Sequence, residues 1–295
     1  MVDVYGKTPP GKIAGREILK SLGTGVMGQN FLAKDGRFTF VIKAINHVIA
    51  ERRSEAGKLK GDTRHPNILA VKEAVVDEIY DEVYITDYIN DMECPGRAFF
   101  WKAGIKETLV TFRKIADAFR FAHETGVTHN NFKPSNLLVK KRKKGIFPMV
   151  TDFGFRLKFD GVSFDAAKKR NVLPYMAPEL IRDFKAGKEY NVESYKKCDL
   201  YSFGAMFCEA ISARDLFGRC VDFDIALEEK ADLAARVIGV TMPNKIVAIP
   251  PLDRLIKGCL AFSSEKRMDS FKTVVGLLTE SLGDQGLESD DTEER

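Results

Sequence analysis

Two short polar segments in the middle of the chain contain the side chains best suited to binding a metal ion. Asn136 ends the segment HNNFKPSN, residues 129–136, and Asp152 lies in TDFG, residues 151–154. The apolar run at residues 137–139 predicts a strand between them. A carboxylate and an amide oxygen that two adjacent loops bring together can hold Mg²⁺, which prefers oxygen ligands. Either residue alone would indicate only a turn, whereas the two segments together predict a magnesium site.

A glycine-rich segment near the N-terminus predicts a phosphate-binding element. Gly23, Gly25 and Gly28 form the pattern G-x-G-x-x-G within GTGVMG. Glycines let backbone N–H groups approach phosphate oxygens without obstruction by side chains. Taken alone, the motif is equally consistent with a hairpin turn that needs positive φ angles. Because it lies between two predicted strands, and not between a strand and a helix, the sequence favours a flap over phosphates rather than a dinucleotide-binding turn.

The elements that position these segments change character along the chain. Alternating apolar runs predict strands at residues 31–33, 38–44, 68–76 and 83–89, with one helix at residues 49–60. Apolar residues at helical spacing predict helices at residues 109–123, 198–211, 227–240 and 270–282. We therefore divide the chain into a leader (1–12), a β-rich lobe (13–89), a helix-rich lobe (90–282) and a tail (283–295). The tail is acidic with almost no large apolar groups, a composition that predicts disorder.

Further segments complete a resemblance to the protein kinase family. HNNFKPSN and TDFG resemble the kinase catalytic loop and metal-binding turn. MAPE at residues 176–179 is similar to the end of the activation loop, and DLYSFG at residues 199–204 to the start of the helix that anchors the larger lobe. Arg267 stands where the family has the arginine that pairs with the glutamate of MAPE, here Glu179. These motifs occur in the same order as in protein kinases, from residue 18 to residue 282. Their sequences most resemble those of bacterial Hanks-type Ser/Thr kinases.

The resemblance implies an α+β fold of two lobes. In the bilobal protein-kinase fold, a small antiparallel β-sheet with one main helix forms the N-terminal lobe, and a larger helical lobe follows. The resemblance implies a nucleotide, ATP with Mg²⁺, in the cleft between the lobes. Lys43, at the end of a predicted strand, would hold the α- and β-phosphates together with the glycine-rich segment. Glu55 in the predicted helix would pair with Lys43, with Glu51 as the competing candidate.

The resemblance also implies a slot for adenine. It places the base over Leu138, beside Thr86 as a small gatekeeper and along the hinge that contains Asp87 and Ile89. Asn30 replaces the family's valine above the base, and Val41 replaces the usual alanine. A polar amide and a larger branched side chain would both alter this apolar slot. The alternative for Asn30 is a hydrogen bond to a neighbouring loop.

The departures from the kinase pattern cluster where a protein substrate would bind. Asn131 occupies the position of the catalytic aspartate, and an amide cannot accept the proton of a substrate hydroxyl near neutral pH. Lys133, which would stabilise developing charge, is kept. Asn130 replaces the arginine that would pair with a phosphorylated activation loop, and Val172 replaces a threonine beside the catalytic position. Together these changes predict that selection for phosphate transfer onto protein has lapsed.

Three hypotheses follow for function. The first is a pseudokinase that binds ATP and Mg²⁺, transfers phosphate weakly or not at all, and acts through a protein partner. The second is an active Ser/Thr kinase in which Asn131 only orients the hydroxyl. A positioned general base contributes about 10²–10⁴-fold, so its loss permits residual activity. The third is a scaffold of kinase fold without nucleotide, which Asn30 and Val41 favour.

The bulk composition sets the class of protein. A chain of 295 residues with 44% hydrophobic and 30% charged residues is typical of a globular protein with a sizeable core. A net charge of +4 is too small to indicate nucleic acid without a concentrated basic patch. The five cysteines are scattered and form no metal-ligand spacing. No signal-peptide core or membrane-length apolar run is present in the sequence, so we expect a cytoplasmic protein without a membrane span.

Overall fold

The computed structural model shows how the chain folds around these segments. It describes residues 11–47, 50–59, 64–96, 98–143, 145–158, 169, 171–188, 192–216, 218, 220, 222–236 and 249–284. Most of the predicted strands and helices lie within them, as do all the predicted site residues.

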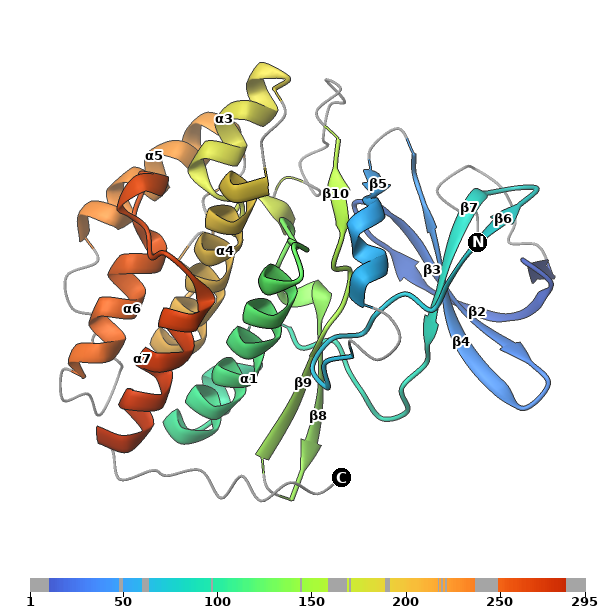
Figure 1. The fold of residues 1–295 in the computed structure, drawn as a ribbon, viewed down its shortest axis with the longest axis horizontal. Coiled ribbons are helices and arrows are strands. Elements are labelled where there is room, and N and C mark those ends of the chain that lie inside the picture. Colours follow the sequence, from blue (N-terminus) through green and yellow to red (C-terminus); the bar gives the residue numbers. More distant parts are fainter. Residues whose placement is uncertain are drawn as a thin grey trace.

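A six-stranded antiparallel sheet forms the N-terminal part, in the order β1-β2-β3-β4-β7-β6 (Figure 1). The strands are β1 (Lys12–Ile13), β2 (Arg16–Thr24), β3 (Gly28–Asp35), β4 (Phe38–Ile45), β6 (Glu73–Asp77) and β7 (Asp81–Asp87). The alternation of apolar residues builds the core on one face of the sheet, where Phe31, Ile42 and Ile85 are fully buried. The run predicted at residues 68–76 is a strand only from Glu73. At its start, Ile68 forms an isolated bridge to Val150.

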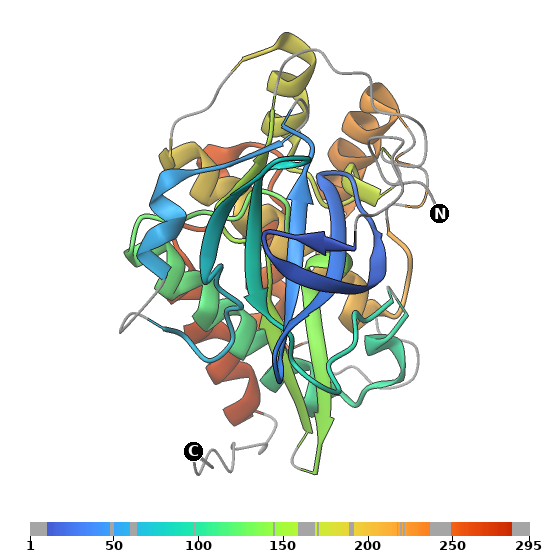
Figure 2. The same ribbon diagram turned by 90° about the vertical axis from the view of Figure 1, so that its right-hand side faces the viewer.

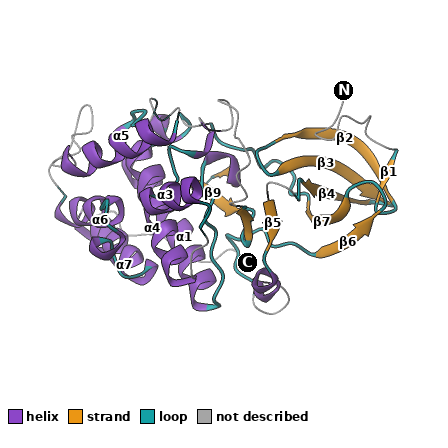
Figure 3. Cartoon of the chain, turned by 90° about the horizontal axis from the view of Figure 1, so that it is seen from above, coloured by secondary structure: helices purple, strands orange, loops and turns teal. Residues whose placement is uncertain are grey.

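Helices make up most of the C-terminal part and gather on the side away from the sheet (Figure 3). They are α1 (Ile105–Glu124), α3 (Pro178–Ala186), α4 (Val192–Ser212), α5 (Phe223–Arg236), α6 (Pro250–Leu260) and α7 (Phe271–Asp284). In α1 the buried residues Leu109, Phe112, Ala116 and Phe119 recur at helical spacing. The ring of Phe112 packs on α4, and the ring of Phe119 packs on Phe271 of α7. The two-lobed architecture implied by the sequence is therefore confirmed.

A hairpin between the two parts carries the predicted metal ligands. Strands β8 (Leu137–Arg142) and β9 (Gly145–Val150) pair so that Leu137 lies opposite Val150. Asn136 directly precedes β8, and Asp152 follows β9 by two residues. Figure 2, with the sheet toward the viewer, shows the hairpin extending below it. The hairpin therefore returns the chain to its starting point, as the predicted magnesium site requires.

The helix predicted at residues 49–60 is not formed. Residues Ala50–Arg52 form strand β5, which pairs with β10 (Phe155–Leu157), and Ser54–Leu59 form a short 3₁₀ helix. Residues 49 and 60 lie outside the described part of the chain. The strand buries Ala50 completely against the segment after TDFG, and Gly57 weakens any helix. A pairing between distant segments thus overrides a local pattern of good helix formers.

Two elements cross the domain limits expected from the sequence. Lys12, assigned to the leader, belongs to β1, and α7 extends to Asp284, two residues into the predicted tail. Residues 1–10 and 285–295 lie outside the described part, and the boundary between residues 89 and 90 stays a prediction. No helix in the described ranges is long and apolar enough to cross a membrane.

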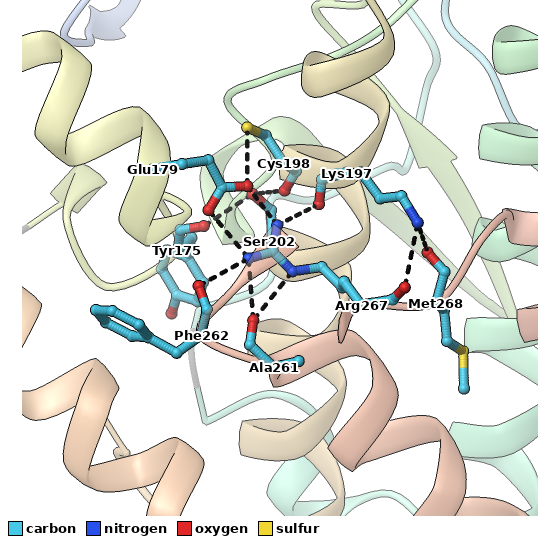
Figure 4. A network of polar contacts seen from close by, with 9 residues as sticks. All are labelled: Tyr175, Glu179, Lys197, Cys198, Ser202, Ala261, Phe262, Arg267 and Met268. Atoms are coloured by element: carbon cyan, nitrogen blue, oxygen red, sulfur yellow. Dashed lines mark hydrogen bonds and ion pairs between the residues drawn. The ribbon is translucent and has the colours of Figure 1, made fainter. Parts of the chain in front are cut away.

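A buried ion pair ties the helical part together (Figure 4). Nη2 of Arg267 donates to Oε2 of Glu179 at 3.0 Å, and the two side chains are 0% and 3% exposed. Two further hydrogen bonds surround the pair. Nη1 of Arg267 donates to the backbone carbonyl of Lys197 at 2.8 Å, and Nζ of Lys197 donates to the backbone carbonyl of Met268 at 2.7 Å. The pairing of Glu179 with Arg267 predicted from the sequence is confirmed.

We expect Arg267→Ala to lower the free energy of unfolding by about 3–5 kcal/mol, because it leaves the Glu179 carboxylate buried without its partner. Urea unfolding followed by circular dichroism measures this change. The matched control is Arg254→Ala, which removes the exposed pair of Arg254 with Glu280 and is expected to cost less than about 1 kcal/mol. Equal losses in the two variants would contradict this account of the buried pair.

Candidate functional site

A cleft of about 480 Å³ lies between the sheet and the helical part. Every site residue predicted from the sequence lines it except Glu55. The glycine-rich segment and Asn30, Val41 and Lys43 come from the sheet, and Thr86, Asp87 and Ile89 come from β7 and the connection after it. The catalytic-loop segment, Leu138 and Asp152 face them. Residues from five separate stretches of sequence are thus brought to one cavity.

The turn between β2 and β3 requires glycine at Gly28. Its φ angle is +156°, and a Cβ atom there would lie 2.0 Å from the carbonyl oxygen of Ala44. Gly23 also has a positive φ, of +122°. Gly28 therefore lets the chain lie directly on strand β4 at the edge of the cleft, whereas a Cβ atom at Gly23 would meet no neighbouring atom.

Lys43 pairs with Asp152 and with neither of the glutamates predicted for it. Nζ of Lys43 lies 2.6 Å from Oδ2 of Asp152, and both side chains are 14% exposed. Glu55 instead pairs with Arg53. Glu51 pairs with Arg156 at 2.6 Å. Both glutamates belong to the segment that forms β5 and the 3₁₀ helix instead of the predicted helix. The Lys43–Glu55 pair is therefore not formed in this structure.

Asp199 anchors the catalytic loop from α4. Its carboxylate is fully buried and accepts hydrogen bonds from the backbone N–H groups of His129 at 2.8 Å and Asn130 at 2.6 Å. It also contacts Nε2 of His123 at 2.9 Å. Asn130 has a left-handed backbone, with φ of 59°, which asparagine tolerates better than most residues. This anchoring fixes where Asn131 enters the cleft.

Asn131 projects into the cleft as a buried amide. Its Nδ2 lies 3.8 Å from Sδ of Met27 in the glycine-rich segment, and its backbone carbonyl accepts a hydrogen bond from Nδ2 of Asn136 at 2.9 Å. A carboxamide has no basic oxygen with which to take a proton at neutral pH. The position can orient a ligand, and it cannot serve as a general base.

Asn136 and Asp152 present oxygen atoms to the same region. The amide nitrogen of Asn136 donates to the backbone of Asn131, and no hydrogen bond to its Oδ1 is found within the described part of the chain, which leaves that oxygen for a ligand. One carboxylate oxygen of Asp152 contacts Lys43, which leaves the other for a cation. One amide oxygen and one carboxylate oxygen, held on adjacent loops, suit a hard ion such as Mg²⁺, which keeps several water ligands.

Lys133 supplies a second cation beside this site. Burial lowers the pKa of its ammonium to about 8, and the nearby charge of Lys43 lowers it further, while Asp152 opposes the shift. No hydrogen-bond partner for its Nζ is found among the residues that the structure describes. A desolvated ammonium that faces a cleft in this way favours an anionic ligand.

Several residues that line the cleft were not anticipated from the sequence, among them Met27 and Phe155. Met27 lies within the glycine motif, but its contact with Asn131 joins residues 104 positions apart. Phe155 follows TDFG, and its ring centroid lies 5.5 Å from Nζ of Lys43. The sequence shows that Met27 lies within one motif and that Phe155 follows another. It does not show their contacts with Asn131 and Lys43, because these depend on how the sheet and the helical part pack together.

Comparison with known protein families matches residues 16–276 to the protein kinase domain. The chain belongs to the protein kinase family. Among similar kinases, the serine/threonine-protein kinase PkaA of Streptomyces coelicolor is 27% identical over 74% of this chain and 38% of its own length. The dual specificity protein kinase shkD of Dictyostelium discoideum is 29% identical over 57% of this chain and 20% of its own length.

One similar kinase has a name that questions its activity. A probably inactive leucine-rich repeat receptor-like protein kinase of Arabidopsis thaliana is 24% identical over 65% of this chain and 20% of its own length. This kinase chain therefore spans a fifth to two fifths of the relatives described here.

We expect amine-reactive reagents to label Lys133 ahead of ordinary surface lysines. With a pKa of about 8, roughly a quarter of its amine is neutral at pH 7.5, against roughly one in a thousand for an unperturbed lysine. Peptide mass spectrometry after brief labelling measures the rate at each lysine. The rate at Lys133 is expected to rise with pH and level off above about 8.

Lys230 is the matched control within the same protein. Burial also lowers its pKa to about 8, but its Nζ donates to the carbonyl of Pro174 at 2.8 Å and it does not line the cleft. We expect it to stay unlabelled in folded protein. Labelling of Lys133 no faster than that of exposed lysines would show that its amine is not desolvated as described.

Proposed function

We propose that this kinase domain is a pseudokinase. It binds ATP with Mg²⁺ in the cleft, transfers phosphate to protein slowly or not at all, and acts by binding a protein partner in a conformation that the nucleotide sets. The observation that carries the proposal is the side chain of Asn131. At the position where a kinase accepts the proton of the substrate hydroxyl, the chain presents an amide directed toward Met27.

The residues that would hold the nucleotide support the binding half of the proposal. Lys43 and the glycine-rich segment would hold the phosphates, and Asn136 and Asp152 would hold the metal ion through their remaining oxygens. The bound ion would neutralise charge on the phosphates. Lys133 adds an amine whose pKa is lowered by burial. A phosphate beside it would raise that pKa and so favour the charged ammonium.

The residues on the protein-substrate side support the other half. Nδ2 of Asn130 donates to Oγ1 of Thr128 at 2.8 Å, within its own loop, and it carries no charge with which to bind a phosphorylated segment. Val172 is buried, and it has no hydroxyl at the position where the family has a threonine. The proposal also places the protein in the cytoplasm, where reducing conditions suit its free thiols, including the exposed Cys94.

Mg-ATP is expected to stabilise the folded protein. At a concentration of 100 times Kd, binding contributes about 2.7 kcal/mol to the free energy of unfolding, which raises the melting temperature by several degrees. Thermal-shift titration measures this. Lys43→Ala is expected to lose most of the shift, while Lys34→Ala, on the neighbouring strand and paired with Glu17 at the surface, keeps it. No shift in the wild type, or equal shifts in both variants, would count against nucleotide binding in this cleft.

The active-kinase alternative rests on the cleft itself, since Lys43, Lys133, Asn136 and Asp152 all line it. Asn131→Asp tests whether the missing base limits phosphate transfer. If the missing base limits transfer, the variant is expected to transfer radiolabelled phosphate about 10²–10⁴-fold faster than wild type, and Asp152→Ala added to it abolishes the gain. An unchanged slow rate in Asn131→Asp would show that the base is not what limits this protein.

A further inference from the structure

The tip of the glycine-rich segment closes the cleft directly above the catalytic loop. Met27 Sδ contacts the Asn131 amide at 3.8 Å, and Met27 is only 4% exposed. Both residues line the cleft. At this point the roof and the floor of the cavity therefore touch.

Backbone contacts hold Met27 in this place. Its carbonyl accepts a hydrogen bond from the N–H of Asn46 at 2.7 Å, and the N–H of Gly25 donates to the carbonyl of Gly28 at 2.8 Å. The neighbouring Val26 is also buried, at 7% exposure. The tip is thus packed against the protein on both sides of Met27, and the contact with Asn131 belongs to a defined turn.

The contact lies where the last phosphate of a triphosphate would have to lie. In phosphoryl transfer the terminal phosphate lies between the glycine-rich loop and the residue that receives the acceptor hydroxyl, whereas the lysine of the sheet holds the earlier phosphates. Non-bonded heavy atoms need about 3.5–4.0 Å between them. Met27 and Asn131 at 3.8 Å therefore leave no room for a phosphate between their side chains.

We propose that Met27 determines the length of phosphate chain that the cleft accepts. With Met27 on Asn131 the site is complementary to a nucleoside diphosphate, and a triphosphate binds only after Met27 leaves its buried position. This inference rests on the proposed nucleotide binding and goes beyond it, because it assigns a preference between nucleotides to one side chain of this chain.

Isothermal titration with Mg-ADP and with Mg²⁺ and the β,γ-methylene analogue of ATP tests the assignment. We expect Met27→Ala to lower the ratio of the triphosphate Kd to the diphosphate Kd by about ten-fold or more. In the wild type, triphosphate binding must overcome the free-energy cost of displacing a buried methionine side chain, and the variant lacks that cost. Asn131→Ala, which empties the other side of the contact, is expected to lower the same ratio, and it provides a second test should Met27→Ala fail to fold.

Two variants serve as matched controls. Met27→Leu fills the same space and is expected to keep the wild-type ratio. Val26→Ala truncates the adjacent buried residue of the same turn and is expected to change both affinities alike. An unchanged ratio in Met27→Ala and Asn131→Ala, or an equal fall in Val26→Ala, would overturn the assignment while leaving nucleotide binding intact. Failure of the wild type and of every folded variant to bind either nucleotide would overturn the proposed function and this inference together.

Discussion

The ion pair between Lys43 and Asp152 is the interaction on which the cleft depends. Lys43 lies on β4 of the sheet and Asp152 on the turn after β9, so their 2.6 Å contact joins the two parts of the molecule. Both groups are largely withdrawn from water, where opposite charges attract more strongly. Asp152 gives the Lys43 ammonium a counter-ion that does not come from residues 50–59. The segment with Glu51 and Glu55 is then available to form β5 against β10.

The cleft has the groups for binding a phosphate chain and lacks the group for catalysing its transfer. The charges that a phosphate chain and a metal ion need are present around one cavity, and the group that would take a proton from an acceptor is absent. Phosphoryl transfer relies mainly on positioning and electrostatic stabilisation. The nucleotide binding proposed above would engage Lys43 and Asp152, whose contact joins the sheet to the helical part.

The sequence predicted the parts of the site that local spacing determines. Asn136 and Asp152 meet because a short hairpin joins them, and the pairing of Leu137 with Val150 leaves little freedom in how it closes. The partner of Lys43 could not be predicted in the same way. Residues Ala50–Leu59 contain good helix formers, yet their structure is decided by β10, more than a hundred residues away along the chain. The contact of Met27 with Asn131 is likewise set by how two distant loops meet.

The central claim is that an amide at position 131 leaves a kinase cleft that binds nucleotide, with Met27 displaced where the nucleotide is ATP, and that does not transfer its phosphate. The most direct test is single-turnover transfer of radiolabelled phosphate by the wild-type protein, on a preparation whose occupancy by Mg-ATP has been measured. We expect occupied protein with transfer far slower than the roughly 1–100 s⁻¹ of active kinases. Transfer to a protein acceptor within that range, dependent on Mg²⁺, would contradict the account.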